Sequence, residues 1–183
     1  ELKIYSMEII FDLETTGTDT NNDKITQYTF LNIKTNTFIA SYVNPEKPIH
    51  PDAVKITGIT DIDLQDKLPF TYHIQKILDF ITQKNTPTFL IAHNGDSFDR
   101  QILANEFKRA GSDFPIFQYF KFIDTVKLSR ALFHDVLEDH SLKSLRRYCN
   151  LSTNNSHSAT KDVFDLAVVY NLFKQKMLSL IHI

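Results

Sequence analysis

The order of apolar segments along the chain is the feature that most restricts its fold. Three short segments rich in β-branched and aromatic residues come first, and the later apolar segments alternate between helical and strand spacing. Three consecutive strands followed by alternating helices and strands are typical of a mixed sheet flanked by helices, in the α/β class. The predicted strands are residues 7–13, 25–33, 37–43, 88–92 and 121–123.

The helices are predicted from apolar residues that recur at intervals of three or four positions. Three prolines within residues 44–51 predict a loop, and Gly111 is placed to end a helix. The predicted helices are residues 70–81, 99–110, 126–133, 141–149 and 159–173.

The composition is that of one folded domain, which we place at residues 7–178. Hydrophobic residues make up 42% of the 183 positions and charged residues 23%, which excludes disordered and low-complexity classes. The only cysteine, Cys149, cannot form an internal disulfide, and no apolar run approaches the roughly 20 residues that span a bilayer. Because a signal-peptide pattern is also absent at the start, we expect an intracellular protein, cytoplasmic or nuclear, without a membrane partner.

The net charge of −2 does not by itself predict a polyanionic partner, so any nucleic acid must be bound by local groups. Lys143, Arg146 and Arg147 lie at i, i+3 and i+4 of a predicted helix. This spacing fits either phosphate contacts or an ordinary solvated helix face.

Two carboxylates stand at the end of the first predicted strand. Side chains two positions apart on a strand point to the same face, so Asp12 and Glu14 lie side by side. Paired carboxylates suit hard divalent cations such as Mg²⁺, which prefer oxygen ligands. Taken alone, the pair also fits two solvated surface acids.

Two more acids open predicted helices, and a histidine precedes the last of them. Asp99 follows a predicted strand directly, and Asp162 falls in the first turn of the final helix. Helix N-termini stabilise negative charge, so capping alone would explain either residue. His157 is expected in the loop before that helix, where it fits a general base beside a metal site or a solvated loop histidine.

These residues form motifs that resemble the DnaQ-like superfamily of DEDDh 3′→5′ exonucleases. The resemblance is carried by residues 12–17, by His93-Asn94 with Phe98-Asp99 downstream, and by His157-x-Ala159-x-x-Asp162. Within the superfamily the chain is most similar to the three-prime repair exonuclease (TREX) group. That similarity rests on residues 56–60, 92–96, 122–125 and 141–145.

The resemblance implies a ribonuclease H-like fold with a mixed five-stranded sheet, and a single DEDDh exonuclease domain. It implies a metal-dependent enzyme that hydrolyses phosphodiester bonds at 3′ ends of nucleic acid, with DNA favoured, and releases nucleoside 5′-monophosphates. Two Mg²⁺ ions, or Mn²⁺ as substitute, would be held by four acids, with His157 as the base. The implied metal ligands are Asp12, Glu14, Asp99 and Asp162, and the implied contacts to the terminal nucleotide are Leu13, Thr15, Ile56, Thr57 and Phe98.

Other functions fit the same motifs. They include a proofreading exonuclease subunit of a DNA polymerase, a 3′→5′ exoribonuclease, a hydrolase of small phosphoesters and a catalytically inactive nucleic-acid-binding module. The segment 37–43 is expected to be an edge strand, and exposed edges pair readily with another chain. Since TREX-like proteins dimerise through such an edge, we also expect a homodimer.

Overall fold

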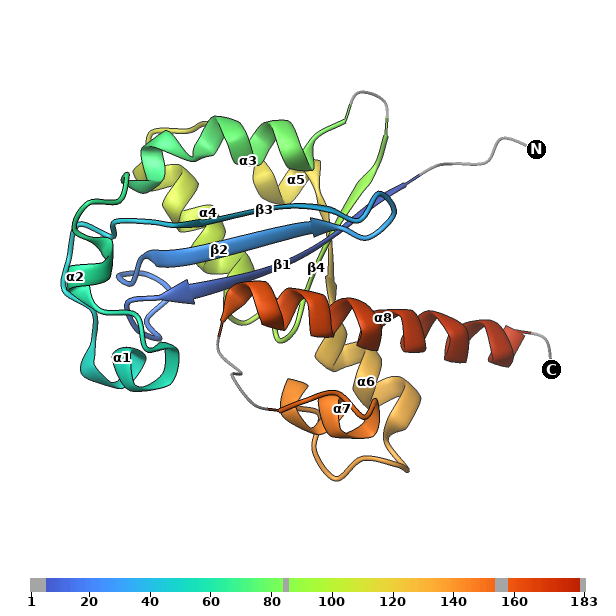
Figure 1. The fold of residues 1–183 in the computed structure, drawn as a ribbon. Coiled ribbons are helices and arrows are strands. Elements are labelled where there is room, and N and C mark those ends of the chain that lie inside the picture. The colour runs from blue at the N-terminus through green and yellow to red at the C-terminus, as the bar shows by residue number, and fades with distance from the viewer. Residues whose placement is uncertain (1–5, 84–85, 154–157, 182–183) are drawn as a thin grey trace.

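The computed structural model describes residues 6–83, 86–153 and 158–181. Five strands form one mixed sheet in the order β3-β2-β1-β4-β5, which confirms the predicted architecture (Figure 1). Strand β2 pairs antiparallel with both β1 and β3, whereas β4 pairs in parallel with β1 and β5 in parallel with β4. The strands are β1 (Met7–Thr15), β2 (Ile25–Asn32), β3 (Thr37–Tyr42), β4 (Thr88–Ala92) and β5 (Lys121–Asp124).

Every predicted helix is present, and three short ones were not predicted. The segment predicted as one helix over 70–81 begins with a 3₁₀ turn at Phe70–Tyr72 and continues as α3 (Ile74–Ile81). The unpredicted helices are α1 (Pro51–Thr57), α2 (Asp61–Leu64) and α5 (Ile116–Tyr119). The remaining helices are α4 (Asp99–Arg109), α6 (Thr125–Phe133), α7 (Leu142–Tyr148) and α8 (Ala159–Ile181). No helix in these described segments is long and apolar enough to cross a membrane.

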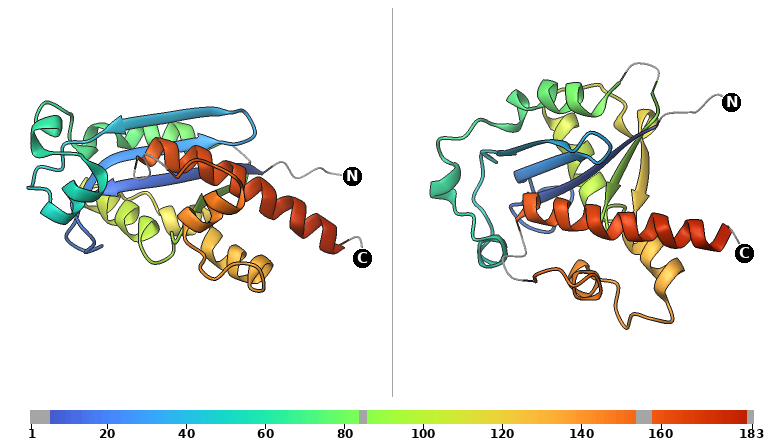
Figure 2. Two further views of the ribbon diagram at one scale, coloured as in Figure 1. Left: turned by 60° about the horizontal axis from the view of Figure 1, so that its bottom comes forward. Right: turned by 45° about the vertical axis from the view of Figure 1, so that its right-hand side comes forward.

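The two faces of the sheet bury separate hydrophobic cores. Phe11 and Leu13 of β1 pack with residues of α3 and α4, whereas Ile10 packs with residues of α6, α7 and α8. Figures 1 and 2 show α8 along one face of the sheet and α3 with α4 on the other. Because strand side chains alternate, Asp12 and Glu14 share the α8 face with Ile10. The fold therefore presents the two strand acids to the helix that carries Asp162.

Candidate active site

Three of the predicted acids converge where β1 meets the start of α8. Asp12 and Glu14 come from β1, and Asp162 from the first turn of α8. One carboxylate oxygen from each of these three lies within 4.8 Å of the others. All three side chains are partly buried. Oxygen donors this close together can hold a hard divalent cation.

The fourth acid, Asp99, lies beside this group of three. It is the first residue of α4 and is only 5% exposed. Its negative charge acts on both Asp12 and Glu14, and the backbone N–H groups of Leu13 and Asp99 itself stabilise its own carboxylate. Asp99 is therefore placed to complete a site of four carboxylates, although its oxygens are not among those that lie within 4.8 Å of one another.

The acids carry more negative charge than their surroundings compensate. Loss of hydration raises the pKa of Asp12 well above its usual range, and the charges of Asp99, Glu14 and Asp162 raise it further. Burial, with Asp162 and Asp99, raises the pKa of Glu14 to about 8, and burial raises the pKa of Asp99 to about 7. Bound divalent cations would supply the missing positive charge, so the residues present fit a metal site.

Side chains from β2 fix the start of α8. Gln27 Oε1 accepts a hydrogen bond of 3.1 Å from the backbone N–H of Ala159, and the hydroxyls of Thr29 and Thr160 lie 2.9 Å apart. Gln27 pairs with Glu14 across the sheet, and Thr29 with Asp12. Sequence reasoning missed these two supporting residues. The sequence signal that could have identified them is that Gln27 and Thr29 are polar residues two positions apart in a largely apolar strand.

Arg146 is also part of the site, in a role that the sequence analysis did not foresee. Its side chain is 2% exposed and forms ion pairs with Asp162 at 2.6 Å and Asp165 at 2.7 Å. The interpretation of Arg146 as a phosphate contact or a solvated residue is therefore wrong, because it points into the protein. Lys143 and Arg147, which share the helix, are exposed.

A cavity of about 520 Å³ opens beside Glu14. This volume is in the range of small-molecule sites, roughly 300–1,000 Å³. The structure brings together in its lining all five residues predicted to contact the terminal nucleotide: Leu13, Thr15, Ile56, Thr57 and Phe98. Lining residues that sequence reasoning missed are Gly17, Thr18, Asp19, Asp23, His50, Asp52 and Ala53.

One wall of this cavity is the loop between β1 and β2, which α4 holds in place. Asn105 Nδ2 donates to the carbonyl of Thr20 at 2.8 Å, and Arg109 Nη1 donates to the carbonyl of Asp23 at 2.9 Å. Arg109 is itself paired with the buried Glu106 at 2.6 Å. Helix α4 thus both carries Asp99 and holds the β1–β2 loop that lines the pocket.

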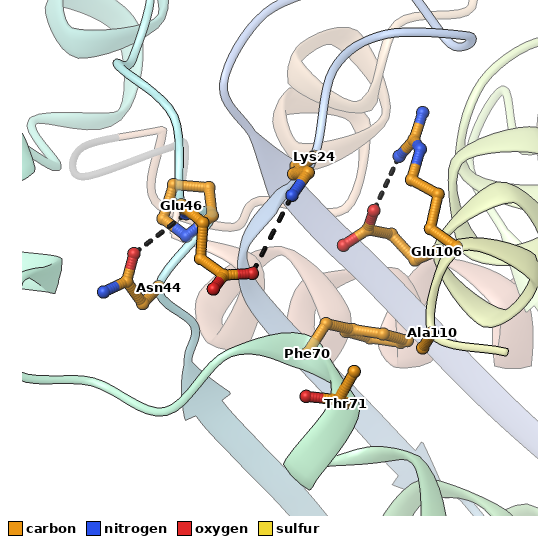
Figure 3. Close-up of a pocket in the computed structure, with 9 residues that line it drawn as sticks. Lys24, Asn44, Glu46, Phe70, Thr71, Glu106 and Ala110 are labelled. Atoms are coloured by element: carbon orange, nitrogen blue, oxygen red, sulfur yellow. Dashed lines mark hydrogen bonds and ion pairs between the residues drawn. The ribbon is translucent and has the colours of Figure 1, made fainter.

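A second, much smaller cavity lies near Glu106. Figure 3 shows Glu106 together with the Lys24–Glu46 ion pair around this space, which has a volume of about 60 Å³. A cavity of this size holds a few waters and no nucleotide. The cavity of about 520 Å³ is the candidate for substrate binding because Glu14 of the acidic group lines it.

His157, the predicted base, lies outside the described residues, so its role stays a prediction.

A family model for exonucleases matches residues 9–170. The chain belongs to this exonuclease family. This membership confirms the predicted DnaQ-like 3′→5′ exonuclease superfamily and its enzymatic activity.

Relatives and solved structures agree with this assignment. The DNA polymerase III subunit epsilon of Buchnera aphidicola subsp. Baizongia pistaciae is 35% identical over 92% of this chain and 71% of its own length. A PolC-type DNA polymerase III of Caldanaerobacter subterraneus subsp. tengcongensis is 27% identical over 92% of this chain, which spans only 12% of that polymerase. Similarity to the TREX group in particular stays a prediction.

The fold matches that of E. coli exonuclease I, solved in complex with a dT13 oligonucleotide. The TM-score is 0.82 at 21% sequence identity, over 97% of this chain and 43% of exonuclease I. This match confirms the ribonuclease H-like fold with its mixed five-stranded sheet.

Proposed function

We propose that this exonuclease shortens DNA from its 3′ end, using two Mg²⁺ ions held by Asp12, Glu14, Asp99 and Asp162, and releases nucleoside 5′-monophosphates. The observation that carries the proposal is the group of three carboxylate oxygens within 4.8 Å of one another, next to a cavity of about 520 Å³. A metal cluster beside a nucleotide-sized pocket fits removal of one terminal residue at a time.

The protein's own residues would bind and orient the chain end. Leu13 and Thr15 line the pocket beside Glu14, while Ile56, Thr57 and Phe98 line its other parts. When bound, two divalent cations supply positive charge to both the attacking and the leaving oxygen of an in-line displacement. His157 would take a proton from the attacking water.

The preference for DNA is supported by the relatives. The two relatives described above are a subunit of DNA polymerase III and a PolC-type DNA polymerase III, and the structure of exonuclease I contains a dT13 oligonucleotide. The test is to incubate 5′-labelled DNA and RNA of identical sequence, single- and double-stranded, with the protein and Mg²⁺ or Mn²⁺. We expect DNA to be shortened to a ladder. Faster loss of RNA would make the protein an exoribonuclease, and turnover of nitrophenyl phosphates alone would make it a small-phosphoester hydrolase.

A second candidate function is proofreading beside a DNA polymerase, which the 35% identity to an epsilon subunit favours. A proofreader would bind the polymerase and remove a mismatched 3′ terminus faster than a paired one. Co-purification with the polymerase of the source organism tests the first property, and the rate ratio on mismatched and matched primers tests the second. This role would place the enzyme inside the cell.

We also propose a homodimer through β3. Within the described part of the chain, β3 pairs on one side only, with β2. Phe38 on this strand is 50% exposed and lies edge-to-face against Phe164 of α8, at 5.4 Å between ring centroids. We expect light scattering at micromolar concentration to give twice the monomer mass, and Phe38→Lys to lower it. A monomeric mass for the unmodified protein would contradict the proposal.

A further inference from the structure

Arg146 is a permanently charged side chain that the fold buries next to the acidic cluster. It lies on the inner face of α7, directly after the fully buried Leu145. Burying a guanidinium costs free energy unless carboxylates compensate it, and arginine cannot escape the cost by losing its proton. A buried arginine at this place therefore needs a specific reason.

The arginine bridges two carboxylates on consecutive turns of α8. Its Nε atom contacts Asp165 Oδ2 at 2.7 Å, and its Nη2 atom contacts Asp162 Oδ1 at 2.6 Å. Asp162 and Asp165 are three residues apart in one helix and so share a face. Asp165 also pairs with Lys161. Asp165 thus anchors the guanidinium, and the guanidinium in turn fixes the side chain of Asp162.

Asp162 is at the same time a member of the three-carboxylate group. The positive charge of Arg146 also reaches Asp12, where it opposes the effect of the neighbouring acids on the pKa of that carboxyl. Arg146 is therefore a fixed positive charge beside carboxylates that bound metal ions would also neutralise.

We propose that Arg146 is a positioning residue and internal counter-ion of the metal site. It holds Asp162 in the orientation of a ligand and compensates part of the cluster's negative charge when the metal ions dissociate. This inference rests on the proposed function, because it requires that the cluster binds divalent cations.

The test compares Arg146→Gln, which removes the charge, with Arg146→Lys, which keeps it. Thermal unfolding is measured in EDTA and over a titration of Mn²⁺ without DNA. We expect Arg146→Gln to unfold at a lower temperature in EDTA and to gain more stability from Mn²⁺ than the unmodified protein. We expect the apparent Mn²⁺ affinity to become at least tenfold tighter, about 1.4 kcal/mol, because the metal replaces the missing cation and this effect outweighs the looser Asp162 side chain. The loss of positioning should be seen as slower turnover of DNA.

Arg146→Lys should bind Mn²⁺ with near-normal apparent affinity but turn over DNA more slowly, because one ammonium cannot bridge both carboxylates as the guanidinium does. Lys174→Gln is the matched control. Lys174 pairs with Glu8 at 3.0 Å near the other end of β1, so its loss should lower stability equally with and without Mn²⁺.

An equal Mn²⁺ effect in Arg146→Gln and the unmodified protein would overturn the proposal and leave Arg146 as a packing residue. Folding of Arg146→Gln only in the presence of Mn²⁺ would support it. If that variant does not fold at all, Asp165→Asn provides the test. This change leaves the charge of Arg146 less neutralised, so Mn²⁺ should stabilise the variant less than the unmodified protein. An equal or larger effect of Mn²⁺ would overturn the proposal. If Mn²⁺ does not stabilise even the unmodified protein, the metal site of the proposed function fails first.

Discussion

At the scale of single residues, the site brings carboxylates so close together that they lower the stability of the metal-free fold. The pKa values of Asp12, Glu14 and Asp99 are all raised, the last two to about 8 and 7. A carboxyl with a higher pKa in the folded than in the unfolded protein binds protons preferentially in the folded state. Without metal, the stability of the fold should therefore decrease as the pH rises from about 4 to about 8.

Replacing Asp12 by asparagine should remove this effect in part. We expect Asp12→Asn to abolish turnover and, in EDTA at pH 8, to raise the free energy of unfolding by about 1–2 kcal/mol, because like charges no longer repel. The gain should shrink at pH 5. Urea denaturation at both pH values measures it. Asp139→Asn is the control, because hydrogen bonds from Ser141 and Ser144 hold the pKa of Asp139 at about 2 and its loss should bring no gain. Residual turnover in Asp12→Asn would show that the acids are not the metal site.

His157 is predicted to be the general base. His157→Ala should lower turnover by about 10²–10⁴-fold while Mg²⁺ binding is retained. In the unmodified enzyme, turnover should rise with pH as the imidazole loses its proton, near pH 6.5 for an unperturbed histidine. The pH profile of both proteins at saturating metal checks this. Near-normal turnover in the variant, with the same acid limb, would make His157 an ordinary loop residue.

The types of the site residues could be predicted from the sequence, but the interactions that support them could not. Asp12 and Glu14 follow from strand periodicity, and Asp99 and Asp162 from their positions at helix starts. From helical spacing alone, Arg146 cannot be distinguished from its exposed neighbours Lys143 and Arg147, because the spacing does not say which face is buried. Its burial depends on Asp165, a contact across two helices that the sequence does not reveal.

At the scale of secondary structure, the position of α8 relative to the sheet decides whether the acids meet. The first backbone N–H groups of a helix lack partners within the helix. In α8, the N–H of Ala159 donates instead to the side chain of Gln27 on β2. Thr29 adds its contact with Thr160. Strand β2 therefore aligns both the strand acids, through pairing, and the helix acid, through capping.

Gln27→Leu should show how the hydrogen bond between Gln27 and α8 affects stability and how it affects turnover. The change leaves the buried N–H of Ala159 without an acceptor, which we expect to cost about 1–2 kcal/mol of stability. Because Asp162 follows in the same helical turn, turnover should also fall even at temperatures where the variant is fully folded. Urea denaturation and initial rates measure the two effects. The control is Gln75→Leu, which removes an exposed bond to Asp79 and should change neither. Unchanged turnover in folded Gln27→Leu would contradict the positioning of α8 by β2.

The long elements were predictable and the short helices were not. The apolar stripe of α3 and the alternation of β1 extend over enough residues to be recognised. Helix α2 has only four residues, and its one signal is the capping box of Thr60 and Asp63. Helix α1 has Pro51 at its start and Gly58 with φ of 73° after its end, but both residues also fit a plain loop.

At the scale of the whole molecule, the site exists only through the tertiary fold. The acids come from β1, α4 and α8, and the pocket wall comes from α1 and from the loop after β1. These segments are separated by up to 150 positions in the sequence, from Asp12 to Asp162. The order of strands and helices predicted the sheet, and the family resemblance predicted which residues would meet. Neither the order of elements nor the resemblance could predict the volume of the pocket or the loop after β1 that forms one of its walls.

We propose that this pocket accepts a free 3′ end and no other part of the nucleic acid. The most direct measurement follows 5′-labelled single-stranded DNA over time with Mg²⁺, in three forms: linear with a free 3′ hydroxyl, linear with a blocked 3′ end, and circular. We expect a ladder of shortened products from the first form, and intact DNA for the other two. Asp12→Asn serves as the control for contaminating nucleases and should leave all three forms intact. Cleavage of the circular DNA by the unmodified protein, but not by Asp12→Asn, would show that the site does not require a free 3′ end.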